Sequence, residues 1–166
     1  MGRRQQGLSM IEILVTLVIL AVGLLGLAGL MIDGLRNNQS AYLRTQASML
    51  AYNMADRMRV NRVEAVAGDY DDYDTSAVDA TTTLPGCASQ TTGCSANDQV
   101  TLDKAEWTRQ IQGTGTIALL PQGVGTITRG AGNLFTITVS WQEIQWSEAA
   151  GANTAGTQQF SVQFSL

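Results

Sequence analysis

Glu12 is the one charged residue in a long apolar stretch, and its carboxylate is the group most in need of a chemical explanation. Between Leu8 and Ile32 no other side chain carries a formal charge. The 20 residues from Ile13 to Ile32 would span roughly 30 Å as a helix, which is the hydrocarbon thickness of a bilayer. A charge at the bilayer centre costs about 2.5 to 3.5 kcal/mol on insertion scales. The stretch therefore predicts a membrane-spanning helix, and the cost of Glu12 predicts a partner for its carboxylate.

The segment in front of this helix differs from an ordinary secretory signal. It carries Arg3 and Arg4 and passes directly into the apolar stretch, which is longer than the roughly 7 to 15 residues of a secretory apolar region. No Ala-x-Ala sequence closes the stretch, so an ordinary signal peptidase has little to cut. Gly7 instead supplies a position without a side chain where the basic tail meets the helix.

The sequence Gly7-Leu-Ser-Met-Ile-Glu12 resembles the class III signal of type IV pilins and of type II secretion pseudopilins. The resemblance implies that a prepilin peptidase cuts between Gly7 and Leu8, and that Leu8 becomes the N-methylated first residue of the mature chain. It also makes Glu12 the fifth-position glutamate of that family. Leu8 departs from the family pattern, in which the mature chain usually begins with Phe.

A second resemblance covers the residues that follow the apolar stretch. Four segments, Leu27–Leu30, Arg36–Arg44, Met54–Arg59 and Asn61-Arg62, are similar to the minor pilins called type IV pilus modification protein PilV. The likeness is strong over the first third of the chain and loose over the remainder. It implies three kinds of partner: a prepilin peptidase, other minor and major pilins, and the inner-membrane pilus assembly machinery.

Glu12 has a physical reason to be in this motif. After cleavage, the new α-amine of Leu8 lies about one helical turn from the Glu12 carboxylate, and a negative charge in the first turn suits the helix dipole. In a helical bundle, the amine of a neighbouring subunit can take the same place. Pairing the two charges offsets part of their desolvation, so Glu12 is predicted to guide subunit docking. The alternative is a carboxylate near the headgroups with no specific role.

The charge distribution separates the helix from the rest of the chain. The 166 residues carry a net charge of −4. Residues 36–62 contain five arginines and one acid, whereas residues 63–166 contain three basic and eleven acidic residues. The acidic second part argues against direct nucleic-acid binding. Arg3 and Arg4 favour a cytoplasmic N-terminus. We therefore expect a single-pass cytoplasmic (inner) membrane protein with a periplasmic domain, which later enters a pilus.

The apolar helix is expected to continue into water and to carry one face of a globular core. Five apolar residues step by three or four positions along this continuation: Leu43, Ala47, Leu50, Met54 and Met58. Neither Gly nor Pro interrupts 35–67. Three glycines in the membrane half, Gly23, Gly26 and Gly29, mark the place where the helix is expected to bend or locally melt, with close packing against another helix as the alternative explanation. A sheet must cover the apolar stripe.

Alternation predicts that sheet in the last part of the chain. Apolar and polar residues alternate in Phe135–Trp141 and in Phe160–Leu166, which are expected to be half-buried strands joined by Gly151–Gly156. Thr126–Thr128 is expected to be a third strand. A short helix is expected before them, capped by Asp98. The predicted fold is α+β and pilin-like, with a long N-terminal helix packed on a small antiparallel sheet.

The middle of the chain is expected to be a long loop. Asp69–Asp74 contains four aspartates; it lacks the Gly and Glu positions of an EF-hand, so a solvated acidic loop is favoured over a calcium site. Cys87 and Cys94 are expected to form one disulfide outside the cytoplasm. The expected organisation is a leader (1–7), a transmembrane helix (8–32), an amphipathic helix (33–67), an acidic and disulfide-containing loop (68–97), and a helix with a sheet (98–166) that forms one globular domain with 33–67.

Catalytic motifs give no support for an enzyme. The chain contains no His, which removes Ser-His-Asp and Cys-His catalysis and His-based metal sites. Gly113–Ala118 matches a dinucleotide-binding pattern but follows no predicted strand, so it is expected to be a loop. We expect no catalytic residue, no cofactor and no metal. The leading hypothesis is a minor pilin, the alternative is a minor pseudopilin of type II secretion, and a third is a membrane-tethered binding protein that acts alone.

Overall fold

The structure, a computed structural model, describes residues 9–114, 119–147 and 149–166. Contacts divide the chain into two compact units, Met1–Ser40 and Ala41–Leu166. The helix α1 (Met10–Val60) contributes to both of them. The expected leader and the cleavage residues Gly7 and Leu8 lie outside the described residues.

The described part of the first unit is helix with its side chains exposed. Every residue from Met10 to Gln39 is exposed, and the first buried residue of α1 is Leu43. Leucine and alanine favour helix in this stretch, and no proline interrupts it. The helix is also unbroken at Gly23, Gly26 and Gly29, so the local melting expected there is absent from this structure. Three glycines cost roughly 3 kcal/mol of propensity together, which the hydrogen-bonded turns on either side outweigh.

The second unit is built on residues 41–60 of α1. The five predicted stripe residues Leu43, Ala47, Leu50, Met54 and Met58 are all buried there. This confirms the stripe as domain core. Each large side chain removed from water contributes about 1.5 to 3 kcal/mol, so the stripe holds α1 to the rest of the unit.

The helix α1 ends at Val60, within the segment 33–67 that was expected to be one amphipathic helix. A short helix, α2 (Arg62–Ala67), follows after Asn61, whose backbone leaves the helical region at φ −101° and ψ 48°. Gly68 ends α2 in the left-handed conformation, with φ 106°. Only glycine adopts that conformation at little cost, so Gly68 allows the chain to reverse toward the sheet.

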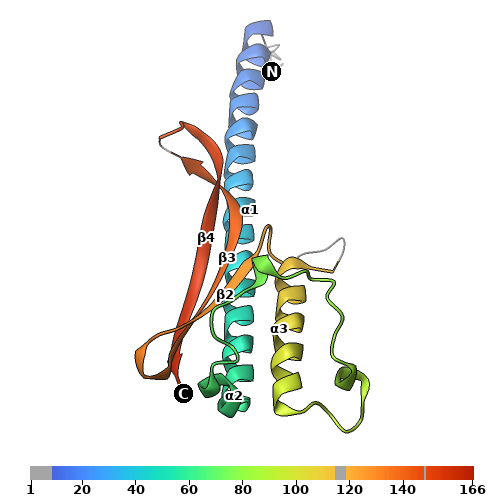
Figure 1. Cartoon of the computed structure of the whole chain (residues 1–166). Helices are drawn as coiled ribbons and strands as arrows, with labels where there is room; N and C mark the ends of the chain where they lie inside the picture. The colour runs from blue at the N-terminus through green and yellow to red at the C-terminus, as the bar shows by residue number, and fades with distance from the viewer. Residues whose placement is uncertain (1–8, 115–118, 148) are drawn as a thin grey trace, which may run out of the picture. The chain divides into compact units, whose positions relative to one another are not determined.

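The sheet is an antiparallel meander of four strands. Its members are β1 (Tyr73–Asp74), β2 (Val124–Arg129), β3 (Leu134–Ser147) and β4 (Ala152–Ser165), in that spatial order (Figure 1). The three expected strands and the α+β class are confirmed. The two-residue strand β1 was not predicted, because it lies among the aspartates and pairs with only Ile127 and Thr126 of β2.

The hairpin of β3 and β4 is longer than expected. The two strands pair without a bulge from Leu134↔Ser165 to Ser147↔Ala152. The prediction that Gly151–Gly156 is only a connection was therefore wrong, since Ala152 onward belongs to β4. Small residues such as Ala, Gly and Asn have weak strand preference, and here the backbone pairing with β3 decides the conformation.

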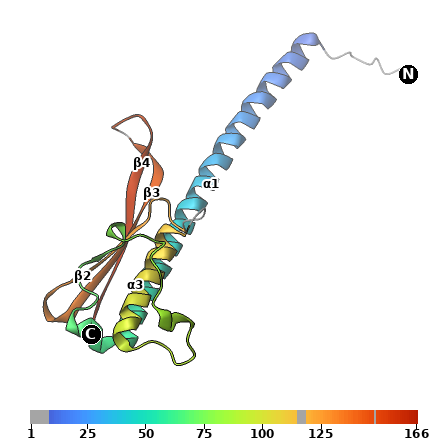
Figure 2. The same cartoon turned by 45° about the vertical axis from the view of Figure 1, so that its right-hand side comes forward.

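The helix α3 (Ala96–Gln112) packs against residues 41–60 of α1 in the second unit (Figure 2). Its N-cap is Ser95, whose Oγ accepts the backbone N–H of Asp98 at 3.2 Å. The expected cap at Asp98 was wrong by three residues. Serine and aspartate are both good caps, and Asp98 lies at the third helical position, where its carboxylate accepts the Ser95 hydroxyl at 2.7 Å.

The short 3-10 helices η1 (Thr75–Ala77), η2 (Gly86–Ser89) and η3 (Ala131–Asn133) complete the described elements.

The helix α3 and the sheet approach each other closely at Gly125 of β2. A Cβ atom placed there would lie 2.5 Å from the ring of Trp107 and 2.5 Å from Ile111. Glycine is therefore required for α3 to lie against β2.

Candidate functional site

The exposed apolar surface of α1 is the first candidate site. Of the described part of the chain, α1 is the helix that is long and apolar enough to cross a membrane. Glu12 lies in its first turn, with its backbone N–H donating to the Ser9 carbonyl at 2.9 Å. It is the one formal charge between Met10 and Ile32. The amine that would face it, on Leu8 after cleavage, lies outside the described residues.

A buried carboxylate, Asp103, is the main polar centre of the folded domain. Asp103 is 2% exposed. Its Oδ1 accepts from Arg57 Nη1 at 3.0 Å and from Gln99 Nε2 at 2.8 Å, and its Oδ2 accepts from the Tyr70 hydroxyl at 2.6 Å. Arg57 also donates to Glu106 at 2.7 Å. A buried charge needs such partners, so this network ties α1, α3 and the segment after α2 together.

The network shifts two pKa values in directions that keep it intact. Burial, followed by the bond to Asp103, raises the pKa of Tyr70, so its hydroxyl stays a donor. Burial alone would lower the pKa of Arg57, but its hydrogen bonds to Glu106 and Asp103 outweigh that effect and raise the pKa. Neither group is poised near neutral pH. The arrangement is therefore that of a network that stabilises the fold, and not that of a proton-transfer site.

The aspartates of Asp69–Asp74 have structural partners of their own. Asp71 pairs with Arg129 of β2 at 3.2 Å, and Asp74 accepts the backbone N–H of Ser76 at 2.7 Å. Tyr70, just before Asp71, is fully buried. The segment is thus packed into the domain at Tyr70 and Asp71, whereas Asp69 and Asp72 are exposed as expected for an acidic surface loop. Nowhere in 9–114, 119–147 or 149–166 do three His, Cys, Asp or Glu side chains gather closely enough to hold a metal ion.

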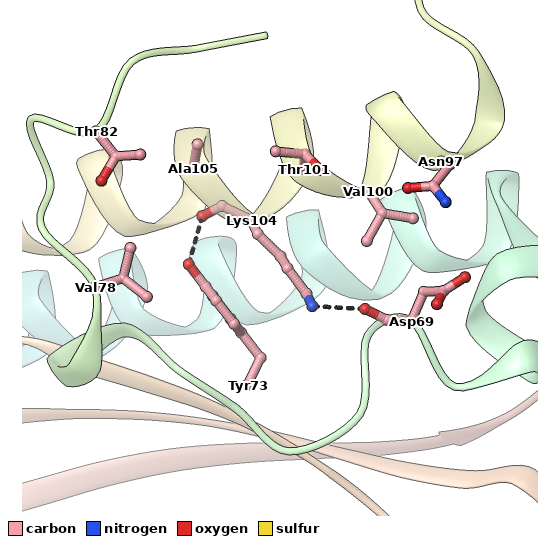
Figure 3. A pocket seen from close by; sticks show the side chains of 9 residues that line it. All are labelled: Asp69, Tyr73, Val78, Thr82, Asn97, Val100, Thr101, Lys104 and Ala105. Carbon is pink, nitrogen blue, oxygen red and sulfur yellow. Dashed lines mark hydrogen bonds between the residues drawn. The ribbon is translucent and has the colours of Figure 1, made fainter.

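A shallow pocket of about 330 Å³ lies between this segment and α3 (Figure 3). Lys104 crosses it and donates to the backbone carbonyl of Asp69, with its ammonium 4.9 Å from the centre of the Tyr73 ring. The Tyr73 hydroxyl in turn bonds the Lys104 carbonyl at 3.2 Å and Thr108 Oγ1 at 2.6 Å. Burial lowers the pKa of Lys104. The Lys104 ammonium and the Tyr73 hydroxyl, which lie in the pocket, are thus both engaged by hydrogen bonds within the domain.

Cys87 and Cys94 form a disulfide, with their Cα atoms 5.0 Å apart. The bridge closes a short loop that includes η2 and ends just before the Ser95 cap of α3. Next to it, Arg109 of α3 donates to the carbonyls of Ala80 at 3.1 Å and Thr82 at 2.6 Å. The Arg109 bonds thus hold the start of the long connection between β1 and α3 against α3, and the disulfide closes a loop within its second part.

Comparison with protein families gives two matches, which together cover residues 2–105. Residues 2–28 match the Prokaryotic N-terminal methylation motif, and residues 29–105 match the family Type IV pilin Tt1218. The chain is a type IV pilin-like protein. Neither a curated protein nor a solved structure matches it.

The assignment explains the exposed apolar helix of the pilin. A methylation motif followed by an apolar helix is the arrangement of a membrane-anchored protein that later enters a pilus. The match to the Tt1218 family ends at residue 105, within α3. The strands β2, β3 and β4, and with them the long hairpin, lie beyond both matches.

Sequence reasoning located the motif but missed the polar network. The network lies in three separate segments, α1, the turn after α2, and α3. Its residues are Arg57, Tyr70, Gln99, Asp103 and Glu106. One signal was present. Asp103 lies four residues before the buried Trp107, on the inward side of α3, where an acidic residue is unusual unless it is paired.

Proposed function

We propose that the pilin is a minor pilin of the PilV type, a non-enzymatic subunit that is incorporated into a type IV pilus or initiates its assembly. In this proposal prepilin peptidase cuts between Gly7 and Leu8, Leu8 is N-methylated, and Glu12 guides docking. The observation that carries the proposal is the exposed apolar surface of α1 with one carboxylate in its first turn. A helix of this kind is stabilised when it packs against similar helices. In the proposal the Glu12 carboxylate sets the axial register of this packing by pairing with the α-amine of a neighbouring subunit.

The sequence similarity over Arg36–Arg62 supports the pilus over the alternative, a minor pseudopilin of type II secretion. Both would use the same anchor. In the proposed topology the N-terminus is cytoplasmic, the helix crosses the inner membrane once, and Ala41–Leu166 is periplasmic before assembly. The proposed partners are prepilin peptidase, other minor and major pilins and the inner-membrane assembly machinery, with no nucleic acid bound directly. A deletion strain that loses twitching motility but keeps protein secretion supports the pilus, and the reverse phenotype supports the secretion system.

The role of Glu12 is tested with Glu12→Ala and the isosteric Glu12→Gln. Both keep Gly7, Leu8 and the apolar helix, so the mature chain should still form in the membrane. Removing the carboxylate leaves a neighbour's amine unpaired in low dielectric, which costs about 3 to 5 kcal/mol, or roughly a hundredfold or more in an association constant. Co-purification of the mature variants with the other pilins should therefore fall by about that factor.

Asp33→Asn is the matched control, because it removes an acid at the far end of the apolar span of the same helix. It should leave co-purification unchanged. Equal recovery of wild type and Glu12→Gln would contradict the docking role of Glu12 and favour a headgroup carboxylate. Retention of Arg3 and Arg4 on the chain in the membrane fraction would instead support a tethered protein that acts alone.

A further inference from the structure

The strand β4 forms an open edge of the sheet. The strand order is β1-β2-β3-β4, so β4 has one neighbour, β3. It pairs with β3 over 14 consecutive residues, a length of about 48 Å. Natural proteins usually protect such an edge with charges, proline, a bulge or a covering element.

Two hydrogen bonds show which backbone groups of β4 are unpaired. Gln142 N–H donates to Pro121 O and Leu134 O accepts from Gly130 N–H, so even-numbered residues of β3 point their backbone groups toward β2. Odd-numbered residues of β3 therefore bond β4, and by the register their partners are the even-numbered residues of β4. The odd-numbered residues of β4 point outward: Asn153, Ala155, Thr157, Gln159, Ser161, Gln163 and Ser165.

These outward groups have the features of a docking edge. All seven residues are exposed, and within the described chain their backbone N–H groups have no hydrogen-bond partner. The segment 152–166 contains no Asp, Glu, Lys, Arg or Pro. None of the usual protections of an edge strand is present.

The chemistry beside the edge selects the kind of strand that fits. Phe160 and Val162 face the core but are only partly buried, and Tyr52 of α1 lies 6.1 Å from the Phe160 ring while remaining half exposed. On the opposite face of β4 the side chains are Thr, Ser, Gln and Asn with one Ala. An incoming strand would cover Phe160 and Val162 with apolar residues and place uncharged polar residues on the other face.

We propose that the free edge of β4 is a β-augmentation site for an extended, uncharged strand of another protein, in which apolar and polar residues alternate. Backbone hydrogen bonds to the outward groups supply affinity, and the apolar rim at Phe160 and Val162 sets the register. A second copy of this chain is disfavoured because it brings a unit with the same sign of charge against the first. Residues 41–166 contain seven basic and twelve acidic residues, a net charge of −5. This surface goes beyond the docking role of the N-terminal helix and does not depend on it.

The probe is a peptide with the sequence of residues 134–141, which alternates apolar and polar residues, kept soluble by lysines added at both ends. The control peptide has the same ends, with serine in place of its four core-facing apolar residues. Binding is measured on the full chain in detergent micelles. The alternating peptide should bind, and hydrogen exchange should slow at the outward amides of β4, such as those of Gln159 and Ser161. The control peptide should do neither.

Ser161→Pro removes an outward backbone N–H and leaves the hydrogen bonds between β4 and β3 intact. Residue 161 is a position at which an edge strand tolerates proline, because its N–H faces away from the sheet. Ser161→Ala is its matched control, since both lose the hydroxyl contact with Thr138. Peptide binding should weaken about tenfold or more in Ser161→Pro and stay near wild type in Ser161→Ala. Ser161→Lys, which keeps the backbone intact and places a charge on the edge, should weaken it as well and provides the test if the proline variant does not fold.

Three results would overturn the proposal. The first is equal binding of the peptide by Ser161→Pro or Ser161→Lys and by Ser161→Ala. The second is no binding of the alternating peptide, or protection of amides away from β4. The third is self-association of the wild type that protects the same amides without peptide, which would assign the edge to a second copy of the chain.

Discussion

The hydroxyl of Tyr70 donates to Oδ2 of Asp103 across 2.6 Å, and both side chains are buried. Because Tyr70 follows α2 and Asp103 lies in α3, this bond joins two segments that are separated by 33 residues. Its acceptor is a carboxylate, and hydrogen bonds to ionised groups are roughly twice as strong as neutral ones. Removing the Tyr70 hydroxyl oxygen therefore tests the contribution of this bond to the polar network, while the bonds of Arg57 and Gln99 to Asp103 remain.

Tyr70→Phe should destabilise the domain by about 1 to 3 kcal/mol, because it leaves an oxygen of a buried carboxylate without its donor. The measurement is denaturant unfolding of the detergent-solubilised chain, followed by tryptophan fluorescence. Tyr42→Phe, at a residue that is 55% exposed, is the control and should change the free energy of unfolding by less than about 0.5 kcal/mol. An equally small effect of Tyr70→Phe would show that the network adds little stability.

The same residue predicts a pH dependence. Burial and the bond to Asp103 raise the pKa of Tyr70 above the ordinary tyrosine value of about 10. The unfolded chain thus releases this proton before the folded protein does, so the contribution is complete below about pH 10 and is lost as the pH rises toward the folded pKa. Above about pH 10, the ordinary tyrosine value, the free energy of unfolding should fall more steeply for wild type than for Tyr70→Phe. Parallel pH profiles would contradict the assignment.

The N-cap of α3 gives a prediction that separates two candidate residues. Ser95→Ala should cost about 0.5 to 2 kcal/mol, because it leaves the backbone N–H of Asp98 without an acceptor. Asp98→Ala should cost less, about 0.3 to 1 kcal/mol, since it removes only a favourable charge and a side-chain bond at the first turn. Denaturant unfolding of both variants provides the comparison. A larger loss in the free energy of unfolding for Asp98→Ala than for Ser95→Ala would show that Asp98 is the N-cap of α3.

Thiol titration and stability measurements test the disulfide between Cys87 and Cys94. Protein purified without reductant should contain no titratable thiol, and the double variant Cys87→Ser, Cys94→Ser should lose about 2 to 3 kcal/mol of stability, because the closed loop is short. Thiol titration of the unfolded chain and denaturant unfolding measure the two effects. Two reactive thiols in the native protein would rule the bridge out.

The sequence predicted the parts of this fold that follow from periodicity. The stripe from Leu43 to Met58 and the strands around Phe135 and Phe160 repeat with the period of a helix or a strand, and burial follows directly from such a repeat. The ends of elements depend on local competition between similar residues. Ser95 and Asp98 are both good caps, and only the helix geometry decides between them.

Long-range contacts were not accessible from periodicity. The strand β1 exists because Tyr73 pairs with Ile127, and the extension of β4 to Ala152 exists because β3 offers backbone partners there. Neither segment has a strong strand preference of its own. The motif from Gly7 to Glu12 behaves differently, since it consists of contiguous residues and could therefore be recognised without a fold.

The last prediction concerns processing at that motif. Gly7→Val should block the conversion of the precursor to the shorter chain that begins at Leu8, because a β-branched side chain would occupy the position where the motif has none. Gly2→Val places the same side chain elsewhere in the leader and is the matched control. N-terminal sequencing of the membrane fraction distinguishes the two forms. We expect Gly2→Val to be processed like wild type and Gly7→Val to keep Arg3 and Arg4. Normal processing of Gly7→Val would remove the basis for a class III signal, and with it the proposed pairing of Glu12 with a free amine.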